Sequence, residues 1–191
     1  MVVRDMSWLS KPLPDARLRV LSLGAGVQST VLALMAAKGE IGPRPDYMIF
    51  ADTQSEPDDV YAHLDWLESE ITRLTNGQMQ LLRVTRGSLE DAVRNGNNST
   101  GQRFVSVPFF TKSPDGADGI TRRQCTSEYK IIPIEREIRR LLGLKPRQHG
   151  PKAAVVEQWI GISTDEKERV NFASKKYIED LKASAAVIKS R

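Results

Sequence analysis

Residues 20–30 read VLSLGAGVQST, and this stretch decides the fold. An apolar run rich in Leu and Val stops at Gly24, and a helical pattern begins directly after the turn. A strand, a glycine-containing turn and a helix start together indicate the first β–α unit of a parallel sheet. Such a turn also leaves backbone amides unpaired at the positive end of a helix dipole, a combination that favours phosphate.

The same stretch supplies the candidate residues for binding phosphate. Glycine lets the backbone approach an anion closely, and Ser and Thr hydroxyls add donors. The lysine of the common P-loop is absent, and the third glycine of G-x-G-x-x-G is absent too. A tight turn with a polar helix cap is the other interpretation of these residues. The candidates for the ligand-binding loop are Ser22, Gly24, Ala25, Gly26, Val27, Gln28, Ser29 and Thr30.

Working outward, four apolar runs predict strands at 17–24, 46–52, 78–86 and 154–163. Strands that alternate with helices imply a parallel sheet covered on both faces. We therefore expect a Rossmann-like three-layer α/β/α sandwich with a mainly parallel sheet. Ligands in such sheets gather beyond the carboxyl ends of the strands, so one site built from separated segments is expected.

Helical periodicity is clearest in the segment 55–74. Its apolar residues recur at spacings of 4, 3, 4 and 3, with Ser55 as the expected N-cap and Pro57 in the first turn. The face of the first helix is expected at Val31, Leu34, Met35 and Lys38, with Gly39 as the cap at its end. Ser88 and Asp91 resemble a capping box, and another helix is expected over 131–143. The periodic residues of the segment 55–74 are Val60, Leu64, Leu67, Ile71 and Leu74.

Length and composition indicate one domain. The chain has 191 residues, 40% of them hydrophobic, which suits one α/β domain at 17–172 with an arm at 1–16 and a basic tail at 173–191. The segment 95–121 is rich in Gly, Asn, Ser and Pro, and a connection of this length is usually functional or mobile. Two aromatic residues are expected to belong to the core, Trp66 on its face or at its edge and Trp159 in a buried strand.

Charge and cysteine usage limit the classes of function. A formal net charge of +4 suits phosphorylated ligands and leaves nucleic acid open as a partner. Cys125 is the only cysteine, which excludes an internal disulfide framework and an iron–sulfur cluster held by this chain. No apolar run approaches the roughly 20 residues of a membrane span, so we expect a cytoplasmic protein without membrane contact. The oligomeric state is left open.

Four segments in order resemble the phosphoadenosine phosphosulfate reductase family, especially its phage and prophage-associated members. This family belongs to the adenine nucleotide alpha hydrolase, or PP-loop, superfamily. GAGVQS looks like a variant of its pyrophosphate-binding loop S-G-G-x-D-S. The segments are LSLGAGVQST, IFADTQSEP with VYAHLDWLE, RRQCTSEYKIIPIEREIR and QWIGISTDEKERV, and together they span roughly residues 18–172.

The resemblance implies an adenine nucleotide, ATP or phosphoadenosine phosphosulfate, with its phosphates on the loop at 24–30. Asp52 and Thr53 match positions near the adenine and ribose, where a carboxylate can accept hydrogen bonds. Capping the following helix is the other interpretation of Asp52. Gly161 permits close approach of a backbone or ligand.

The segment TRRQCTSEYK supplies the candidate catalytic residues Arg123, Lys130 and Cys125. The match to the family's Arg–Cys–Lys segment implies that Arg123 and Lys130 contact a phosphate or sulfate. Cys125 beside these cations could act as a thiolate nucleophile, or it could be a small buried residue before a helix.

A third group of residues bears on a metal ion. The carboxylates of Asp165 and Glu166 could hold Mg²⁺ together with a nucleotide phosphate. The alternative is that they lie in the first turn of a helix, near its amino end.

Two departures from the family pattern affect the expected chemistry. Gln28 stands where the loop usually has an acidic residue, and an amide cannot hold Mg²⁺ as a carboxylate does. Related chains continue into a part with further cysteines, and this sequence has none after Cys125. Sulfur-transfer or reductase-like chemistry at an α-phosphate or sulfate is therefore one hypothesis. A catalytically silent nucleotide-binding module and a nucleic-acid sulfur-modification enzyme are the alternatives.

Overall fold

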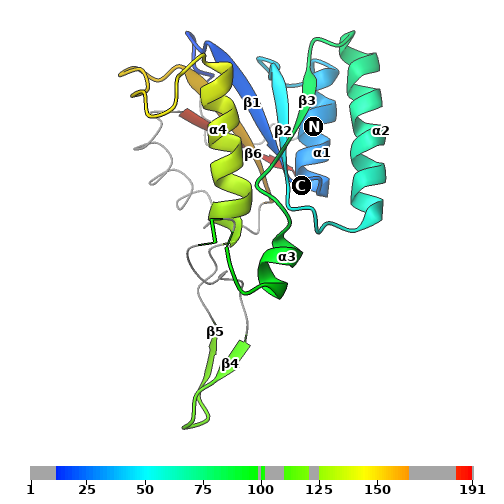
Figure 1. The fold of residues 1–191 in the computed structure, drawn as a ribbon. Helices are drawn as coiled ribbons and strands as arrows, with labels where there is room; N and C mark the ends of the chain where they lie inside the picture. The colour runs from blue at the N-terminus through cyan, green and yellow to red at the C-terminus, as the bar shows by residue number, and fades with distance from the viewer. Residues whose placement is uncertain (1–11, 99, 102–109, 121–124, 164–183, 191) are drawn as a thin grey trace.

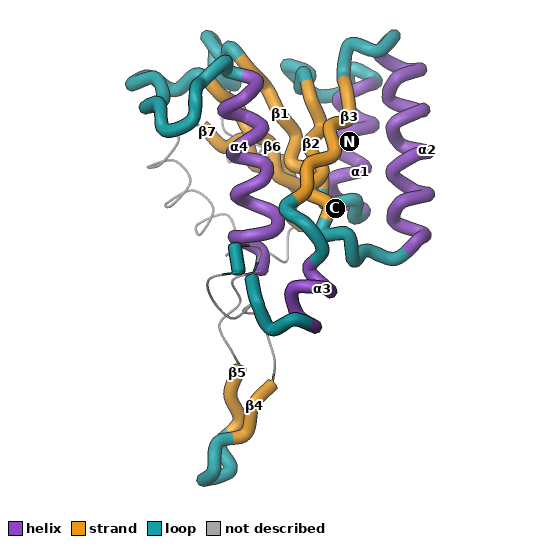
Figure 2. The backbone as a smooth tube through the Cα atoms, viewed as in Figure 1, coloured by secondary structure: helices purple, strands orange, loops and turns teal. Residues whose placement is uncertain are grey.

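Five strands form one parallel sheet in the order β3-β2-β1-β6-β7 (Figures 1 and 2). The structure, a computed structural model, describes residues 12–98, 100–101, 110–120, 125–163 and 184–190. The predicted α/β class is confirmed, and four of the strands lie where the apolar runs predict them. The strands are β1 (Leu18–Leu23), β2 (Tyr47–Asp52), β3 (Gln80–Thr85), β6 (Val156–Ser163) and β7 (Ser184–Ser190).

Helices cover both faces of this sheet, as the predicted three-layer architecture requires (Figure 1). Helices α1 (Val27–Ala37) and α2 (Asp58–Thr75) pack on one face, and α4 (Ile132–Leu141) packs on the other. The alternation of side chains along each strand separates two cores. Leu21 and Leu23 of β1 face α1 and α2, whereas Leu18 and Val20 face α4.

Helix α2 confirms the predicted apolar face and corrects its start. Leu64, Leu67 and Ile71 are completely buried in the core beneath this helix. Pro57 is the N-cap, one residue before the helix begins. The prediction of Ser55 as N-cap is wrong, because its hydroxyl donates to the Thr53 carbonyl and accepts the Glu90 amide instead.

Helix α1 turns a different face to the core from the one expected. Its buried positions include Leu32, Ala33 and Ala36, whereas Val31, Leu34 and Met35 are partly exposed and Lys38 is exposed. The helix carries apolar residues on most of its surface, so periodicity gives little contrast between faces. Small alanines also let the helix approach the sheet closely. Gly39 follows the helix with a φ of 75°, as its predicted capping role requires.

A π-helix (Thr126–Ile131) precedes α4 and continues directly into it. The sequence predicted only the α-helix, and α4 agrees with that prediction to within two residues at each end. Pro133 lies in the first turn of α4 and has no amide to donate to the preceding turn. A wider helical turn in front of a proline accommodates this missing hydrogen bond, and such turns are frequent at functional sites.

Three strands were not expected from the sequence. Strands β4 (Phe110–Lys112) and β5 (Asp118–Ile120) form an antiparallel hairpin that projects from the body (Figure 1). Residues 184–190 pair with β6 as β7. The prediction of a basic tail after residue 172 is therefore wrong for these residues, because they belong to the sheet.

The short helix α3 (Leu89–Arg94) follows β3 at the carboxyl edge of the sheet (Figure 2). The Ser88 hydroxyl accepts the Asp91 amide at 3.0 Å, which confirms the N-cap of the predicted capping box. Among the described residues, no helix has the length and apolar content needed to cross a membrane.

Candidate functional site

The loop after β1 lies at the point where the strand order reverses. β1 pairs with β2 on one side and with β6 on the other, and the chain leaves β1 to enter α1. In open parallel sheets a crevice forms outside the carboxyl ends of the strands at this point, and ligands bind there. The candidate loop at 24–30 therefore occupies the position where this architecture places a site.

Ser29 fixes the shape of this loop from inside. Its hydroxyl accepts the Gly24 amide at 3.2 Å and donates to the Gly26 carbonyl at 3.1 Å. Between these two contacts Ala25 adopts a φ of 55°, a left-handed conformation that is uncommon for alanine. Strain of this kind persists only where neighbouring contacts enforce it, and it concentrates at binding sites.

The amino end of α1 carries open hydrogen-bond donors. Among the described residues, the backbone amides of residues 25–29 have no acceptor, and only the Gly24 amide is occupied, by Ser29. Gly26 is the N-cap without a side-chain hydrogen bond, and the first turn of α1 contains no acidic residue. Val27 is 73% exposed in that turn. Several amides and the positive end of the dipole are thus directed at one accessible place.

Thr30 and Ser29 serve the fold with their hydroxyls. Both residues are more than nine-tenths buried. The Thr30 hydroxyl forms a 2.9 Å hydrogen bond with Nε2 of His63, which ties α1 to α2. The His63 ring lies 5.4 Å from that of Trp66, which is half exposed rather than part of the core. These two hydroxyls already have partners within the protein. Of the predicted donors to a ligand, the backbone amides and the partly buried Gln28 remain.

Gly161 allows α1 to approach β6. A Cβ added to this residue would lie 2.8 Å from the Ser29 amide nitrogen and 3.0 Å from the Gln28 carbonyl carbon. Real Cβ atoms do not approach backbone atoms so closely. The close approach expected at Gly161 is thus made by the amino end of α1 itself.

Ser22 lies inside the sheet, beneath the loop. Its hydroxyl accepts a 2.6 Å hydrogen bond from Nε2 of Gln158 on the neighbouring strand β6. Gln158 is buried, and among the described residues its Oε1 has no hydrogen-bond partner. Ser22 therefore links β1 to β6 at the switch point. The sequence drew no attention to Gln158, because a single polar residue in an apolar strand carries no periodic signal.

Asp52 organises the loop after β2. Its Oδ1 accepts the Gln54 amide at 2.7 Å and the Tyr61 hydroxyl at 2.9 Å. The carboxylate thus holds the turn that leads into α2, but it does not cap the helix, whose N-cap is Pro57 without a side-chain hydrogen bond. Burial, together with the hydrogen bond to Asp52 and its charge, raises the pKa of Tyr61 above its ordinary value of 10.0.

The Tyr61–Asp52 contact predicts a pH effect on stability. A raised pKa means that the folded chain holds the phenol proton more tightly, so stability is full below pH 10 and falls as the pH rises above it. Tyr61→Phe should lower stability at neutral pH and make its decline above pH 10 less steep. Urea unfolding at a series of pH values measures both effects. An unchanged slope above pH 10 would contradict the prediction, and Tyr47→Phe is the control for the loss of a phenol at another position, on β2.

Thr53 and Lys130 meet at Glu56. The Thr53 hydroxyl donates to Glu56 Oε1 at 3.1 Å, and Lys130 Nζ pairs with the same oxygen at 3.2 Å. This contact joins the loop after β2 to the π-helix across 74 residues of sequence. Lys130 thus lies at the carboxyl edge of the sheet with a carboxylate partner.

The remaining predicted residues are placed only in part. Cys125 directly precedes the π-helix and is partly buried. Arg123, Asp165 and Glu166 lie outside the described residues. Within the described part of the chain, no three His, Cys, Asp or Glu side chains converge as a metal site would require.

The structure therefore places the loop at 24–29, the turn after β2 and Lys130 of the π-helix at the same edge of the sheet. Searches of protein-family models, curated proteins and solved structures found no match to this chain.

Proposed function

We propose that this chain binds an adenine nucleotide, ATP or phosphoadenosine phosphosulfate, with a phosphate group on the backbone amides of residues 25–28. The observation that carries the proposal is the open amino end of α1, with an exposed loop and no acid in its first turn. The resemblance to the phosphoadenosine phosphosulfate reductase family supports the same ligand. Asp52 and Thr53 would lie near the ribose, in the turn that Tyr61 and Glu56 hold.

The reaction class that fits this site is transfer at the α-phosphate or at the sulfate. Preformed amides stabilise negative charge that develops on a phosphoryl oxygen without reorganising. Lys130 and Arg123 are proposed to contact the same group, and Lys130 would exchange its Glu56 partner for the ligand. Release of sulfite requires two electrons from thiols, and this sequence supplies one thiol, Cys125. The second thiol would then have to come from outside this sequence, and the two thiols would form a disulfide as sulfite leaves.

The side chains at this site are poor ligands for Mg²⁺. Gln28 offers an amide, and Oδ1 of Asp52 already accepts two hydrogen bonds within the protein. We therefore propose that the amides, rather than a metal ion held by this loop, carry the phosphate contact.

Substitution of Val27 tests the phosphate site directly. Val27→Asp places a carboxylate beside the open amides, where it competes with phosphate and repels it, so nucleotide affinity should fall by about tenfold or more. An acid in the first turn also interacts favourably with the helix dipole, so the variant should unfold no earlier than wild type. Calorimetric titration with ATP, phosphoadenosine phosphate and phosphoadenosine phosphosulfate measures the affinity, and NMR of the amides at 24–29 locates the ligand.

The control is Val27→Asn, which has nearly the same shape without the charge. It should keep affinity within about twofold of wild type, because surface substitutions of neutral residues change little. Equal affinities for the Asp and Asn variants would show that nucleotide does not bind at the amino end of α1, and the proposal would be withdrawn.

A nucleotide-binding module without turnover is the second candidate. Two observations favour it: Gln28 replaces the acidic residue of the loop, and Lys130 is paired with Glu56. Assays of pyrophosphate and sulfite release separate the two candidates. Product formation supports the enzyme, whereas saturable binding without product supports the silent module.

A further inference from the structure

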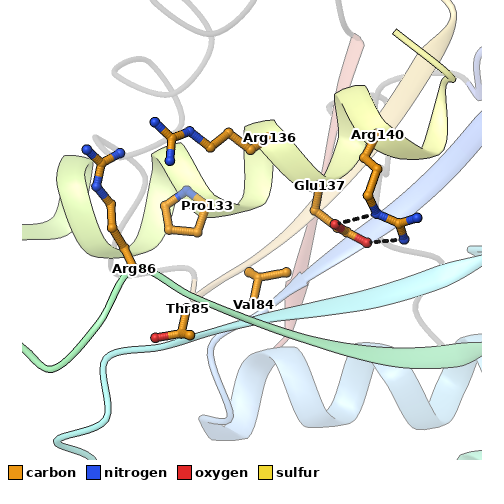
Figure 3. Close-up of a pocket in the computed structure, with 7 residues that line it drawn as sticks. All are labelled: Val84, Thr85, Arg86, Pro133, Arg136, Glu137 and Arg140. Atoms are coloured by element: carbon orange, nitrogen blue, oxygen red, sulfur yellow. Dashed lines mark hydrogen bonds and ion pairs between the residues drawn. The ribbon is translucent and has the colours of Figure 1, made fainter. Parts of the chain in front are cut away.

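The loop between α4 and β6 is strongly basic. Between Glu137 and Glu157 the sequence has five Lys and Arg residues and no Asp or Glu. Both of these flanking acids already have cationic partners. Figure 3 shows Glu137 paired with Arg140, at 2.9 and 2.6 Å. The buried Glu157 pairs with Arg19 at 3.4 Å. The loop therefore keeps an excess of positive charge.

The basic surface, as we call it, consists of four exposed cations on this loop and beside it. They are Lys145, Arg147, Lys152 and Arg17. Among the described residues, none of the four has an ion-pair partner. The Arg17 amide donates to the Val155 carbonyl at 2.8 Å, which places Arg17 at the end of the loop. Asp15 is the acid nearest to Arg17 in the sequence, and the surface stays positive with this carboxylate counted.

Hydrogen bonds hold this loop in one shape. The Arg139 guanidinium donates to the Gln148 carbonyl, and the Lys145 amide donates to Oε1 of the same glutamine at 2.9 Å. The Leu144 amide donates to the Arg139 carbonyl at 3.0 Å, which ties the start of the loop to the end of α4. The cations are thus carried by a fixed backbone and not by a free tail, so less conformational entropy is lost when a ligand binds.

The absence of exposed apolar anchors narrows the class of partner. In the described part of the chain, the large hydrophobic side chains that are exposed are Val27, Trp66, Val93 and Phe110, and none of them lies in this loop. A helix or loop that binds a membrane surface also buries apolar side chains, and protein interfaces depend on aromatic anchors. The phosphate backbone of a nucleic acid requires only cations, so it fits this surface best.

We propose that the basic surface binds the phosphate backbone of a nucleic acid. It lies at the amino edge of the sheet, where α4 ends and β6 begins (Figure 1). The proposed nucleotide loop lies at the carboxyl end of β1, and the six residues of that strand span about 20 Å. The inference therefore does not depend on the proposed function, and both ligands can bind at the same time.

Short duplexes of DNA and RNA with one sequence test the proposal. Fluorescence anisotropy of the labelled duplexes follows their binding to the whole chain over about 50 to 200 mM salt. We expect saturable binding of at least one duplex, with an affinity that falls linearly on logarithmic scales as salt rises, because counterions are released. A slope of about −3 to −4 corresponds to one phosphate contact for each of the four cations.

Two triple variants of equal net charge complete the test. The loop variant combines Lys145→Gln, Arg147→Gln and Lys152→Gln. The control variant combines Arg73→Gln, Arg83→Gln and Arg94→Gln, which remove three cations from ion pairs on α2, β3 and α3. The loop variant should bind the duplex at least about tenfold more weakly, with a salt slope reduced by about three. The control variant should keep the slope of wild type. Urea unfolding checks that both variants fold.

Several results would overturn the proposal. One is the absence of saturable binding by both duplexes at low salt. Another is equal weakening by the two triple variants, which would show only general attraction to a basic protein. Equally tight binding of poly-glutamate would show that phosphate is not recognised. Tighter binding of vesicles that contain phosphatidylserine would assign the surface to a membrane. NMR shifts caused by the duplex solely at the amides of residues 24–29 would assign the phosphates to the loop after β1.

Discussion

Replacing Gly161 with alanine is expected to lower the stability of the folded chain by about 1–3 kcal/mol and to weaken nucleotide binding at the same time. The added Cβ would meet the Ser29 amide nitrogen at 2.8 Å and the Gln28 carbonyl carbon at 3.0 Å. Both atoms belong to the backbone of α1, so neither can move as the tip of a flexible side chain would. The helix must shift away from β6, and the amides at its amino end move with it.

Gly150→Ala is the matched control for this experiment. No atom lies within 4 Å of a Cβ built at Gly150, so the same added methyl group should be tolerated. Urea unfolding gives the stability of both variants, and titration with ATP gives their affinity. A Gly161→Ala protein with the unfolding midpoint of wild type would show that α1 can move without loss, contrary to the packing described here.

Glu157→Ala is expected to cost about 3 kcal/mol of stability, in the range found when one partner of a buried ion pair is removed. The residue is 1% exposed, yet its carboxylate has three donors. They are the Leu13 amide at 2.9 Å, the Trp159 indole at 2.7 Å and the Arg19 guanidinium at 3.4 Å. Removal of the carboxylate leaves a buried indole N–H and a largely buried cation without their acceptor.

Two further variants refine this prediction. Glu157→Gln keeps one acceptor oxygen in place and should fall between wild type and the alanine variant. Glu70→Ala removes a carboxylate from an exposed ion pair with Arg73 and should unfold close to wild type, because such pairs contribute little. Chemical denaturation compares all four proteins. Equal losses from Glu157→Ala and Glu70→Ala would contradict the structural role of Glu157.

Local signals in the sequence predicted most of the sheet and the clearest helix. β1, β2, β3 and β6 are short apolar runs bounded by polar or glycine residues, and the spacing of Leu64, Leu67 and Ile71 specifies α2. The turn between β1 and α1 was found because a strand end, a glycine and a helix start adjoin in sequence. These features depend on neighbouring residues, and the chain order of the elements then predicts a parallel sheet.

Contacts between distant segments could not be predicted in this way. The Glu56–Lys130 pair and the contact of Gly161 with the amino end of α1 both join parts of the chain that only the folded sheet brings together. The hydroxyl of Ser29 could be recognised as a donor from sequence. Its use within the loop depends on the left-handed turn at Ala25, which no periodicity reveals.

The hydroxyl of Ser29 has a thermodynamic consequence for any ligand of the loop. This hydroxyl holds Gly24 and Gly26 in place without a ligand. The conformational entropy of these residues is therefore lost when the chain folds and not when a ligand binds. Capture of a phosphate at this loop then requires no rearrangement of the backbone. Its rate should rise in proportion to ligand concentration, without the plateau that a slow conformational step would impose.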